Sequence, residues 1–127
     1  VAPQNIETLL RRIDGISQAV VIGDRRKFLS ALMTIDPERA PALAAEKGWP
    51  TDPAELAKHE AFRAHVDRGV EEANAGLAKY ETIKKYTLIP DDFTIETGEL
   101  TPTQKIKRRV VNEKYEAEIE AFYEGLK

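Results

Sequence analysis

The 127-residue sequence contains no cysteine, one methionine, one tryptophan and two histidines. Without cysteine, disulfide bonds, thiolate zinc sites and cysteine nucleophiles are all excluded, and the composition fits a cytoplasmic protein. No apolar run approaches membrane-spanning length, and the N-terminus shows no signal-peptide pattern. The formal net charge of −3 gives no reason to expect a general polyanion-binding protein.

What is present fits an ordinary globular protein, with 42% hydrophobic and 32% charged residues. A chain of this length is large enough to bury a proper core, and we expect residues 1–127 to form one domain. Strand patterns occupy the segments 16–23, 28–35 and 83–89. Helical spacing of apolar residues indicates helices near 6–13, 37–48, 53–80 and 106–126.

These elements predict an α+β fold: a small, mostly antiparallel three-stranded sheet covered by helices, with a peripheral β-hairpin that carries a lysine loop. The first two strands are expected to pair across the charged turn 24–27. A turn at Thr97 and Gly98 is expected to form the hairpin. Such a small sheet needs helices over its apolar face, and the amphipathic helices can supply that cover.

Two patterns suggest ligand sites but lack the required spacing. The turn Gly23–Lys27 has neither the glycine spacing nor the Lys-Ser/Thr pair of a phosphate-binding P-loop. His59, Glu60 and His65 form HExxxxH rather than the HExxH of zinc proteases, so we expect both histidines on helix surfaces and no metal site. Trp49 is interpreted as a core or loop anchor.

The stretch LTPTQKIKRR at 100–109 is the most informative part of the sequence. Pro102 between two threonines predicts a loop, and a strongly periodic helix follows from about Ile106. Lys105 therefore lies where a loop becomes a helix, with an ammonium that can project from the domain edge. Phosphate and carboxylate oxygens are the natural partners of such a charge. The simpler interpretation is the basic start of a solvated helix.

The flanking residues favour the functional interpretation. They are VAPQNIE at 1–7, YTLIPDDFT at 86–94, GELTPT at 98–103, KIKRRVV at 105–111 and KY at 114–115. Together they resemble the C-terminal end of adenylate-forming enzymes, the superfamily of acyl-CoA synthetases, luciferases and peptide-synthetase adenylation domains. Most of that superfamily carries Ser-Gly before the lysine, whereas Thr103 and Gln104 precede it here. The lead-in at 100–103 is typical of the long-chain fatty acyl-CoA synthetases.

The resemblance implies that residues 1–127 are the C-terminal mobile (lid) domain of a long-chain fatty acid–CoA ligase. The large N-terminal domain that binds ATP and the acyl chain would be absent, together with a hinge residue upstream of Val1. Lys105 would swing into the active site during adenylation of the acid, and the domain would then reorient for thioester formation with coenzyme A. The isolated domain is expected to be inactive.

The resemblance also implies the ligands. The full-length enzyme would use fatty acid, ATP, Mg²⁺ and coenzyme A, and none of these is expected bound to the isolated domain. Its main partner would be the large domain of the same enzyme, with no nucleic acid and no transmembrane segment, and peripheral membrane association of the full-length protein is left open. Candidates for contacts with coenzyme A or other phosphates are Arg25, Lys27, Lys107 and Arg108.

Two other functions stay open on the sequence. One is a module that binds nucleic acid or an anionic surface through the basic residues Lys84, Lys85, Lys105, Lys107, Arg108 and Arg109, whose binding would weaken steeply with salt. The acidic net charge and the lack of aromatic residues interleaved with that cluster argue against it. The other is a non-catalytic partner-docking domain in which Lys105 is ordinary surface chemistry.

Overall fold

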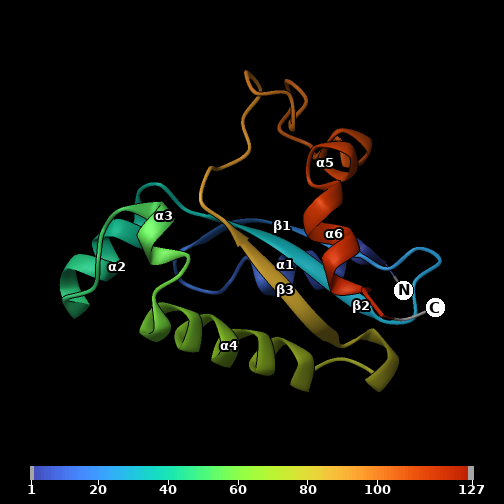
Figure 1. Ribbon diagram of the computed structural model, residues 1–127, viewed down its shortest axis with the longest axis horizontal. Coiled ribbons are helices and arrows are strands. Elements are labelled where there is room, and N and C mark those ends of the chain that lie inside the picture. The colour runs from blue at the N-terminus through green and yellow to red at the C-terminus, as the bar shows by residue number, and fades with distance from the viewer. Residues whose placement is uncertain (1, 126–127) are drawn as a thin grey trace. The chain divides into compact units, whose positions relative to one another are not determined.

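A computed structural model describes residues 2–125 (Figure 1). The chain divides into two compact units, the first ending at Asp92 and the second beginning at Phe93. Unit 1 contains the sheet, and unit 2 contains the lysine loop and the last two helices. In residues 2–125 the elements of unit 1 are α1 (Pro3–Leu10), β1 (Ile16–Ile22), β2 (Leu29–Ile35), α2 (Arg39–Lys47), α3 (Pro53–Leu56), α4 (Glu60–Ala75), a 3₁₀ turn (Lys79–Glu81) and β3 (Ile83–Ile89); those of unit 2 are α5 (Arg108–Lys114) and α6 (Glu116–Phe122).

The sheet has the strand order β1-β2-β3. β1 and β2 pair antiparallel, with Ile16 opposite Ile35, and the turn between them is the expected one. The α+β class and the three strands are confirmed. The sheet is mixed rather than mostly antiparallel, because β3 pairs parallel to β2, with Thr34 opposite Ile89. In the sequence, helices α2, α3 and α4 come between β2 and β3. They return the chain to the end of the sheet where β2 began, as parallel pairing requires.

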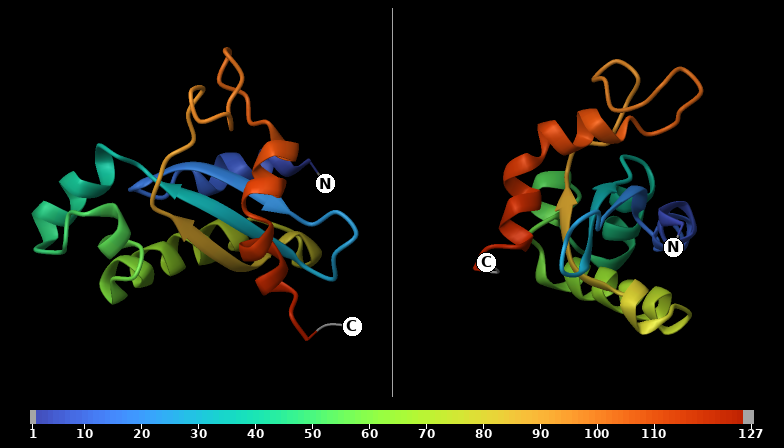
Figure 2. Two further views of the ribbon diagram at one scale, coloured as in Figure 1. Left: turned by 45° about the horizontal axis from the view of Figure 1, so that its top comes forward. Right: turned by 90° about the vertical axis from the view of Figure 1, so that its right-hand side faces the viewer.

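One hydrophobic core joins the sheet of unit 1 to its helices. α1 packs along β1 and against α4, and α2 packs on α3 beyond one end of the strands (Figures 1 and 2). The fully buried side chains of this core include Ile6, Leu10, Met33, Ile35, Leu56, Phe62 and Val66. Trp49 is partly buried against the same core, with its ring 6.2 Å from that of Phe62, so its interpretation as an anchor is confirmed.

The helix ends of unit 1 follow their sequence signals. Asp36 caps the start of α2, since its Oδ1 accepts hydrogen bonds from the backbone N–H groups of Glu38 and Arg39. Gly48 ends the helix in the left-handed region, at φ 75°. The helix predicted over 53–80 ends earlier than expected, since α4 ends at Ala75 and Tyr80 is 77% exposed.

The last residue of unit 1, Asp92, is bonded to two strands of the sheet. Its two carboxylate oxygens accept hydrogen bonds of 2.8 Å from the hydroxyls of Ser17 on β1 and Thr34 on β2. Thr34 is fully buried, and its hydroxyl also accepts the backbone N–H of Gln18, at an irregularity where the register of β1 shifts. The chain after β3 is thereby held to the sheet through Asp92.

The close approach of α4 to the end of α1 gives a stability prediction. A Cβ on Gly69 would lie 2.5 Å from Cγ1 of Ile13, and Ile13 is itself buried. Ala is the better helix former by about 1 kcal/mol, but overpacking against a β-branched side chain costs about 1–3 kcal/mol, so Gly69→Ala should lower the free energy of unfolding. Urea denaturation of the 127-residue chain measures this.

The control is Gly76→Ala, where the nearest atom to the new Cβ would be 3.8 Å away, an ordinary contact. In an Ile13→Ala background, Gly69→Ala should lower the free energy of unfolding by less, because the Ile13 side-chain atoms that the new Cβ would contact have been removed. A Gly69→Ala variant as stable as the unmodified chain would contradict the prediction.

Candidate functional site

Lys105 lies on a short loop whose two ends are joined by backbone pairing. An isolated antiparallel bridge pairs Leu100 with Ile106, and the N–H of Lys107 donates to the carbonyl of Glu99 at 2.7 Å. The expected hairpin is therefore present as a five-residue loop, 101–105, closed by this bridge. The turn at 94–98 that was expected to form it is held mainly by threonine side chains, and Gly98 there has φ 95°.

The backbone on both sides of Lys105 is hydrogen-bonded to one residue, Thr101. The N–H of Thr101 donates to the carbonyl of Lys105 at 2.8 Å, and the N–H of Lys105 donates to the Thr101 hydroxyl at 3.0 Å. Gln104 adopts a left-handed conformation, φ 64°, and its N–H donates to the carbonyl of Thr101 at 2.7 Å. The loop is thus a tight structure of its own, with the Lys105 side chain exposed.

The helix after the loop begins at Arg108, two residues later than predicted. Ile106 and Lys107 are held extended by the pairing with Leu100 and Glu99, so neither can adopt helical dihedral angles. The predicted single helix also bends at Tyr115, which separates α5 from α6. The Tyr115 ring lies 6.1 Å from that of Phe93. The predicted position of Leu126 falls outside the described residues.

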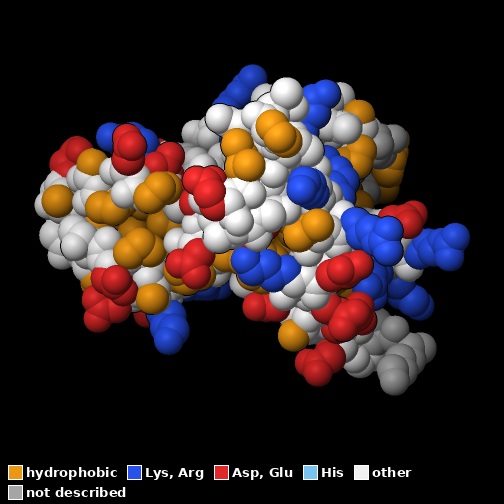
Figure 3. Space-filling model, turned by 90° about the horizontal axis from the view of Figure 1, so that it is seen from above, with side chains coloured by type: hydrophobic (Ala, Val, Ile, Leu, Met, Phe, Trp, Pro, Cys, Tyr) orange, Lys and Arg blue, Asp and Glu red, His pale blue; other side chains and the backbone are white. Residues whose placement is uncertain are grey.

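The basic residues near Lys105 differ in their surroundings. Lys107 is exposed, Arg108 is half-buried, and the exposed Arg109 pairs with Glu113 one helical turn later, at 3.3 Å. Acidic and basic side chains lie among one another on the face drawn in Figure 3. The ammonium of Lys105 has no hydrogen-bond or ion-pair partner within residues 2–125. Its charge is therefore available to an external anion.

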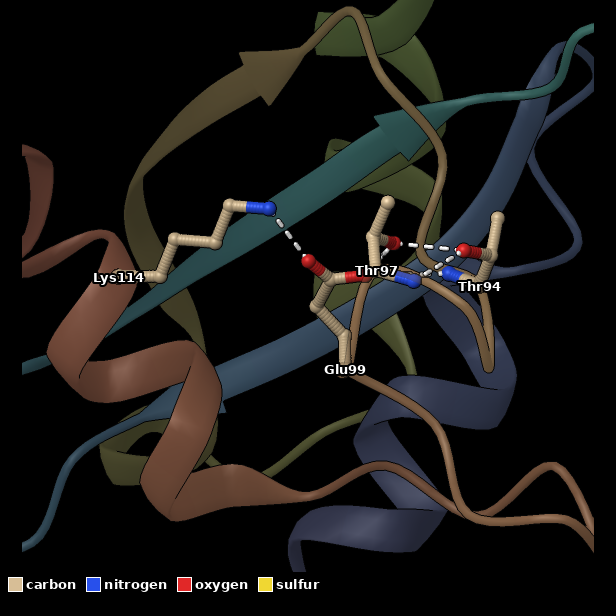
Figure 4. A network of polar contacts seen from close by, with 4 residues as sticks. All are labelled: Thr94, Thr97, Glu99 and Lys114. Atoms are coloured by element: carbon tan, nitrogen blue, oxygen red, sulfur yellow. Dashed lines mark hydrogen bonds and ion pairs between the residues drawn. The ribbon is translucent and has the colours of Figure 1, made fainter.

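The carboxylate of Glu99, at the start of the loop, is buried and fully bonded (Figure 4). Its Oε1 accepts hydrogen bonds from the N–H of Thr94 at 3.1 Å and the hydroxyl of Thr97 at 2.5 Å. Its Oε2 accepts one from the ammonium of Lys114 on α5, at 2.5 Å. One buried side chain thus joins the turn at 94–97 to helix α5.

The same donors determine the charge of Glu99. Burial by itself would raise the pKa of the carboxyl, because low-dielectric surroundings disfavour the ionised form. The hydrogen bonds from Lys114, Thr97 and Thr94, together with the positive charge of Lys114, outweigh burial and lower the pKa from 4.5 to about 2. Glu99 is ionised at neutral pH.

The other two predicted site residues belong to unit 1. Arg25 and Lys27 are exposed in the turn between β1 and β2, where Arg25 adopts a left-handed conformation with φ 59°. The N–H of Arg26 donates to the carbonyl of Gly23 at 3.1 Å, which closes the turn. The predicted residues therefore form two groups, Lys105, Lys107 and Arg108 in unit 2, and Arg25 and Lys27 in unit 1.

Glu99 and Lys114 are functional candidates that sequence reasoning missed. Both lie in segments that match the superfamily pattern, but their pairing joins residues 15 positions apart and has no helical or strand period. The available signal is an acidic residue placed between Gly98 and a buried Leu100. Such a residue needs a cationic partner, and the sequence offers several lysines without indicating which one.

Residues 2–125 contain no group of three or more His, Cys, Asp or Glu side chains placed to hold a metal ion. His65 instead contacts the carbonyl of Asp14 at 2.8 Å, and His59 stacks near Trp49. None of the helices in this range is long and apolar enough to cross a membrane.

Comparison with known proteins identifies related sequences. The family described as the AMP-binding enzyme C-terminal domain matches residues 1–127. Long-chain-fatty-acid–CoA ligase FadD15 of Mycobacterium tuberculosis is 44% identical over 131 residues, which cover 97% of this chain and 21% of that protein. Long-chain-fatty-acid–CoA ligase 5 of Mus musculus is 31% identical over 129 residues, covering 99% of this chain and 19% of the ligase. This chain thus spans about a fifth of the length of these relatives.

Solved structures share the fold. The A-PCP didomain of carboxylic acid reductase from Segniliparus rugosus, in complex with AMP, matches with a TM-score of 0.73 and 27% identity, over 97% of this chain and 16% of that one. A fatty acyl CoA synthetase of Mycobacterium tuberculosis matches with a TM-score of 0.53 and 21% identity, over 91% of this chain and 18% of that one. At that lower identity the likeness concerns the fold only.

The lowered pKa of Glu99 predicts how stability depends on pH. The pKa of Glu99 is about 2 in the folded state and 4.5 in the unfolded chain, so the ionised carboxylate stabilises the folded state above about pH 4.5. This stabilisation is lost as the pH falls from 4.5 to 2. Glu99→Gln should therefore lower the free energy of unfolding at pH 7 by on the order of 3 kcal/mol, and the difference from the unmodified chain should narrow across that range.

Urea denaturation followed by the NMR signals of residues 93–125 measures this difference at several pH values. The matched control is Glu113→Gln, which breaks an exposed ion pair on α5. It should change stability little at any pH, because exposed pairs are weak. If the difference in free energy of unfolding between Glu99→Gln and the unmodified chain stays constant between pH 6 and about pH 3, the ionised carboxylate is not the source of the stability.

Proposed function

Because this chain belongs to the AMP-binding enzyme C-terminal domain family, we propose that it is the mobile C-terminal domain of a long-chain fatty acid–CoA ligase and that Lys105 is its adenylation lysine. Relatives named as long-chain-fatty-acid–CoA ligases match nearly the whole chain, which supports this class of parent enzyme. The observation that carries the role of Lys105 is its placement: an exposed ammonium on a loop whose backbone is bonded on both sides of it. The remaining domain of the enzyme would hold the substrates.

In the first half-reaction, an oxygen of the fatty acid carboxylate attacks the α-phosphorus of ATP. The new bond joins the acyl oxygen to phosphorus, the bond to the β-phosphate bridging oxygen breaks, and pyrophosphate leaves. Both reacting groups are anionic, and negative charge accumulates on the phosphoryl oxygens. The Lys105 ammonium bridges the carboxylate and those oxygens, so it orients one anion against the other and offsets their repulsion.

In the second half-reaction, the sulfur of coenzyme A attacks the acyl carbonyl carbon. The thiol proton is released, the bond from the acyl carbon to the phosphate oxygen breaks, and AMP leaves with that bonding pair. This step needs no cation between carboxylate and phosphate, and Lys105 would stand where the thiol must enter. The domain therefore withdraws Lys105 between the two steps and presents another face to the coenzyme.

The ligands of this reaction divide between this chain and the rest of the enzyme. Mg²⁺ accompanies ATP and would add its own positive charge; the described residues offer no group of three acidic or histidine side chains to hold it, so its ligands would come from the rest of the enzyme. Four basic residues suit the phosphates of coenzyme A: the exposed Lys27 and Lys107 as point charges, and the exposed Arg25 and half-buried Arg108 as planar groups with several donors.

Lys105→Ala in the full-length ligase tests the proposal. Adenylation of fatty acid should slow by about 10²–10³-fold, the usual effect of removing one preorganised contact to developing charge. Formation of acyl-CoA from supplied acyl-adenylate should proceed at close to the normal rate. Single-turnover measurement of each half-reaction gives both numbers.

A matched control is Lys47→Ala, which removes an equally exposed lysine from the last turn of α2. It should leave both half-reactions unchanged. If Lys105→Ala also leaves both unchanged, Lys105 is ordinary surface chemistry, and the partner-docking alternative gains the support that this proposal loses.

The isolated 127-residue chain should have no ligase activity and should bind ATP very weakly, because the residues that would enclose the nucleotide lie outside it. Calorimetric titration of the chain with ATP and Mg²⁺ measures this. Saturable, tight binding would contradict the proposed division of the site. Titration with a DNA duplex at low and high salt tests the anion-binding alternative, for which affinity would fall steeply as salt rises.

A further inference from the structure

The ionised carboxylate of Glu99 is an unusual component of unit 2, because it is 1% exposed and carries a full charge. Burying a charge is costly unless donors surround it. The donors here come from two separate places, the turn at 94–97 and the helix α5 (Figure 4). Since an apolar residue could fill this position without the cost of burying a charge, the question is what the charged pair does here.

Glu99 also lies at the base of the loop that carries Lys105. Its carbonyl accepts the N–H of Lys107, and the next residue, Leu100, pairs with Ile106. The backbone of Glu99 thus closes the loop, while its side chain holds the base of the loop to Lys114. This bond reaches the last residue of α5, more than one helical turn beyond the start of the helix at Arg108.

The loop above this base is internally rigid but exposed. Thr101 bonds the backbone of Lys105 in both directions, and Pro102, Thr103 and Gln104 are exposed. Such a loop moves as one body when its base moves. The direction in which the Lys105 ammonium leaves unit 2 therefore depends on how the base is fixed to the helix.

We propose that Glu99 and Lys114 are positioning residues for Lys105: the ion pair between the buried Glu99 carboxylate and the Lys114 ammonium, whose side chain is 45% exposed, fixes the base of the lysine loop to α5. This deepens the proposed function and rests on it. The pair acts at a distance from the reacting atoms, through the bonded backbone between Glu99 and Lys105. An error of about 1 Å in placing a reacting group can cost about a hundredfold in rate, so a firm base matters for the adenylation step.

The isosteric substitution Glu99→Gln tests the charge without changing the volume. One carboxylate oxygen faces the N–H of Thr94 and the other faces the Lys114 ammonium, so both partners are N–H donors. The amide NH₂ of a glutamine must face one of them, donor against donor, in either orientation. Lys114→Met removes the ammonium and keeps an apolar chain of similar length. The two substitutions should have similar effects, and the double variant should be no worse than either.

The first measurement is amide hydrogen exchange in the 127-residue chain, resolved by NMR. The amides of Lys105 and Lys107 are hydrogen-bonded within the loop and report its opening. In Glu99→Gln and in Lys114→Met they should exchange at least about tenfold faster, while the amides of β1 and β2 keep their protection, because a local opening in unit 2 does not unfold the sheet of unit 1. The control is Glu113→Gln, which breaks the exposed ion pair with Arg109 on the same helix. It should leave these exchange rates unchanged.

The second measurement uses the full-length ligase and its two half-reactions. Glu99→Gln and Lys114→Met should slow adenylation by about 10–100-fold and leave acyl-CoA formation from supplied acyl-adenylate within about twofold. A merely structural loss would reduce the amount of active enzyme and lower both half-reactions equally. Lys114→Arg, which keeps a cation within reach, should recover part of the adenylation rate.

These outcomes distinguish the positioning role of Glu99 and Lys114 from the proposed function of Lys105 on which it rests. Faster loop exchange together with selective loss of adenylation supports the positioning role. Unchanged loop exchange, or equal loss of both half-reactions, overturns it. If Lys105→Ala abolishes adenylation but Glu99→Gln and Lys114→Met do not slow it, the positioning role is wrong and the adenylation lysine stands. If Lys105→Ala itself has no effect, the proposed function fails and the positioning role fails with it.

Discussion

A charge can be kept inside a protein only where donors replace the water it has lost, and in unit 2 that requirement falls on Glu99. Its three donors belong to a turn and to a helix that are distant in the sequence, so satisfying one carboxylate brings the two together. The position of the loop at 101–105 follows from this, since its base begins at the same residue. An apolar side chain would fill the space but would not bind the ammonium of Lys114, the one lysine of α5.

The sheet of unit 1 depends on a different constraint, the burial of its apolar face by helices of the same unit. Three helices separate β2 from β3, and one of them, α4, contributes buried aromatic and aliphatic side chains to the core. The long connection also makes the observed parallel pairing of β3 with β2 possible, since parallel neighbours cannot be joined by a short hairpin loop.

The sequence predicted most of the elements because their signals are local. Cap residues such as Asp36 and Gly48 act only on the backbone of the adjacent helix end. Helix α2 accordingly lies within the range 37–48 that the sequence predicted. The parallel pairing of β3 was missed, because a strand pattern carries no direction. The start of α5 was missed by two residues, because a backbone bond from Lys107 to Glu99 outweighs helical periodicity there. The role proposed for Lys105 comes from its motif, whereas the Glu99–Lys114 pair depends on tertiary geometry that no spacing rule contains.

The carboxylate of Asp92 has a consequence for where this chain can be divided. It accepts hydrogen bonds from Ser17 and from the fully buried Thr34, and it is the last residue of unit 1. A cut or an insertion before Asp92 would leave a buried hydroxyl without its acceptor, at the cost of an unmade hydrogen bond in the sheet. A junction after Asp92 leaves both bonds intact. Hydrogen-bonding chemistry therefore assigns Asp92 to the sheet, and a designer who grafts a different segment onto this sheet should retain the aspartate with it.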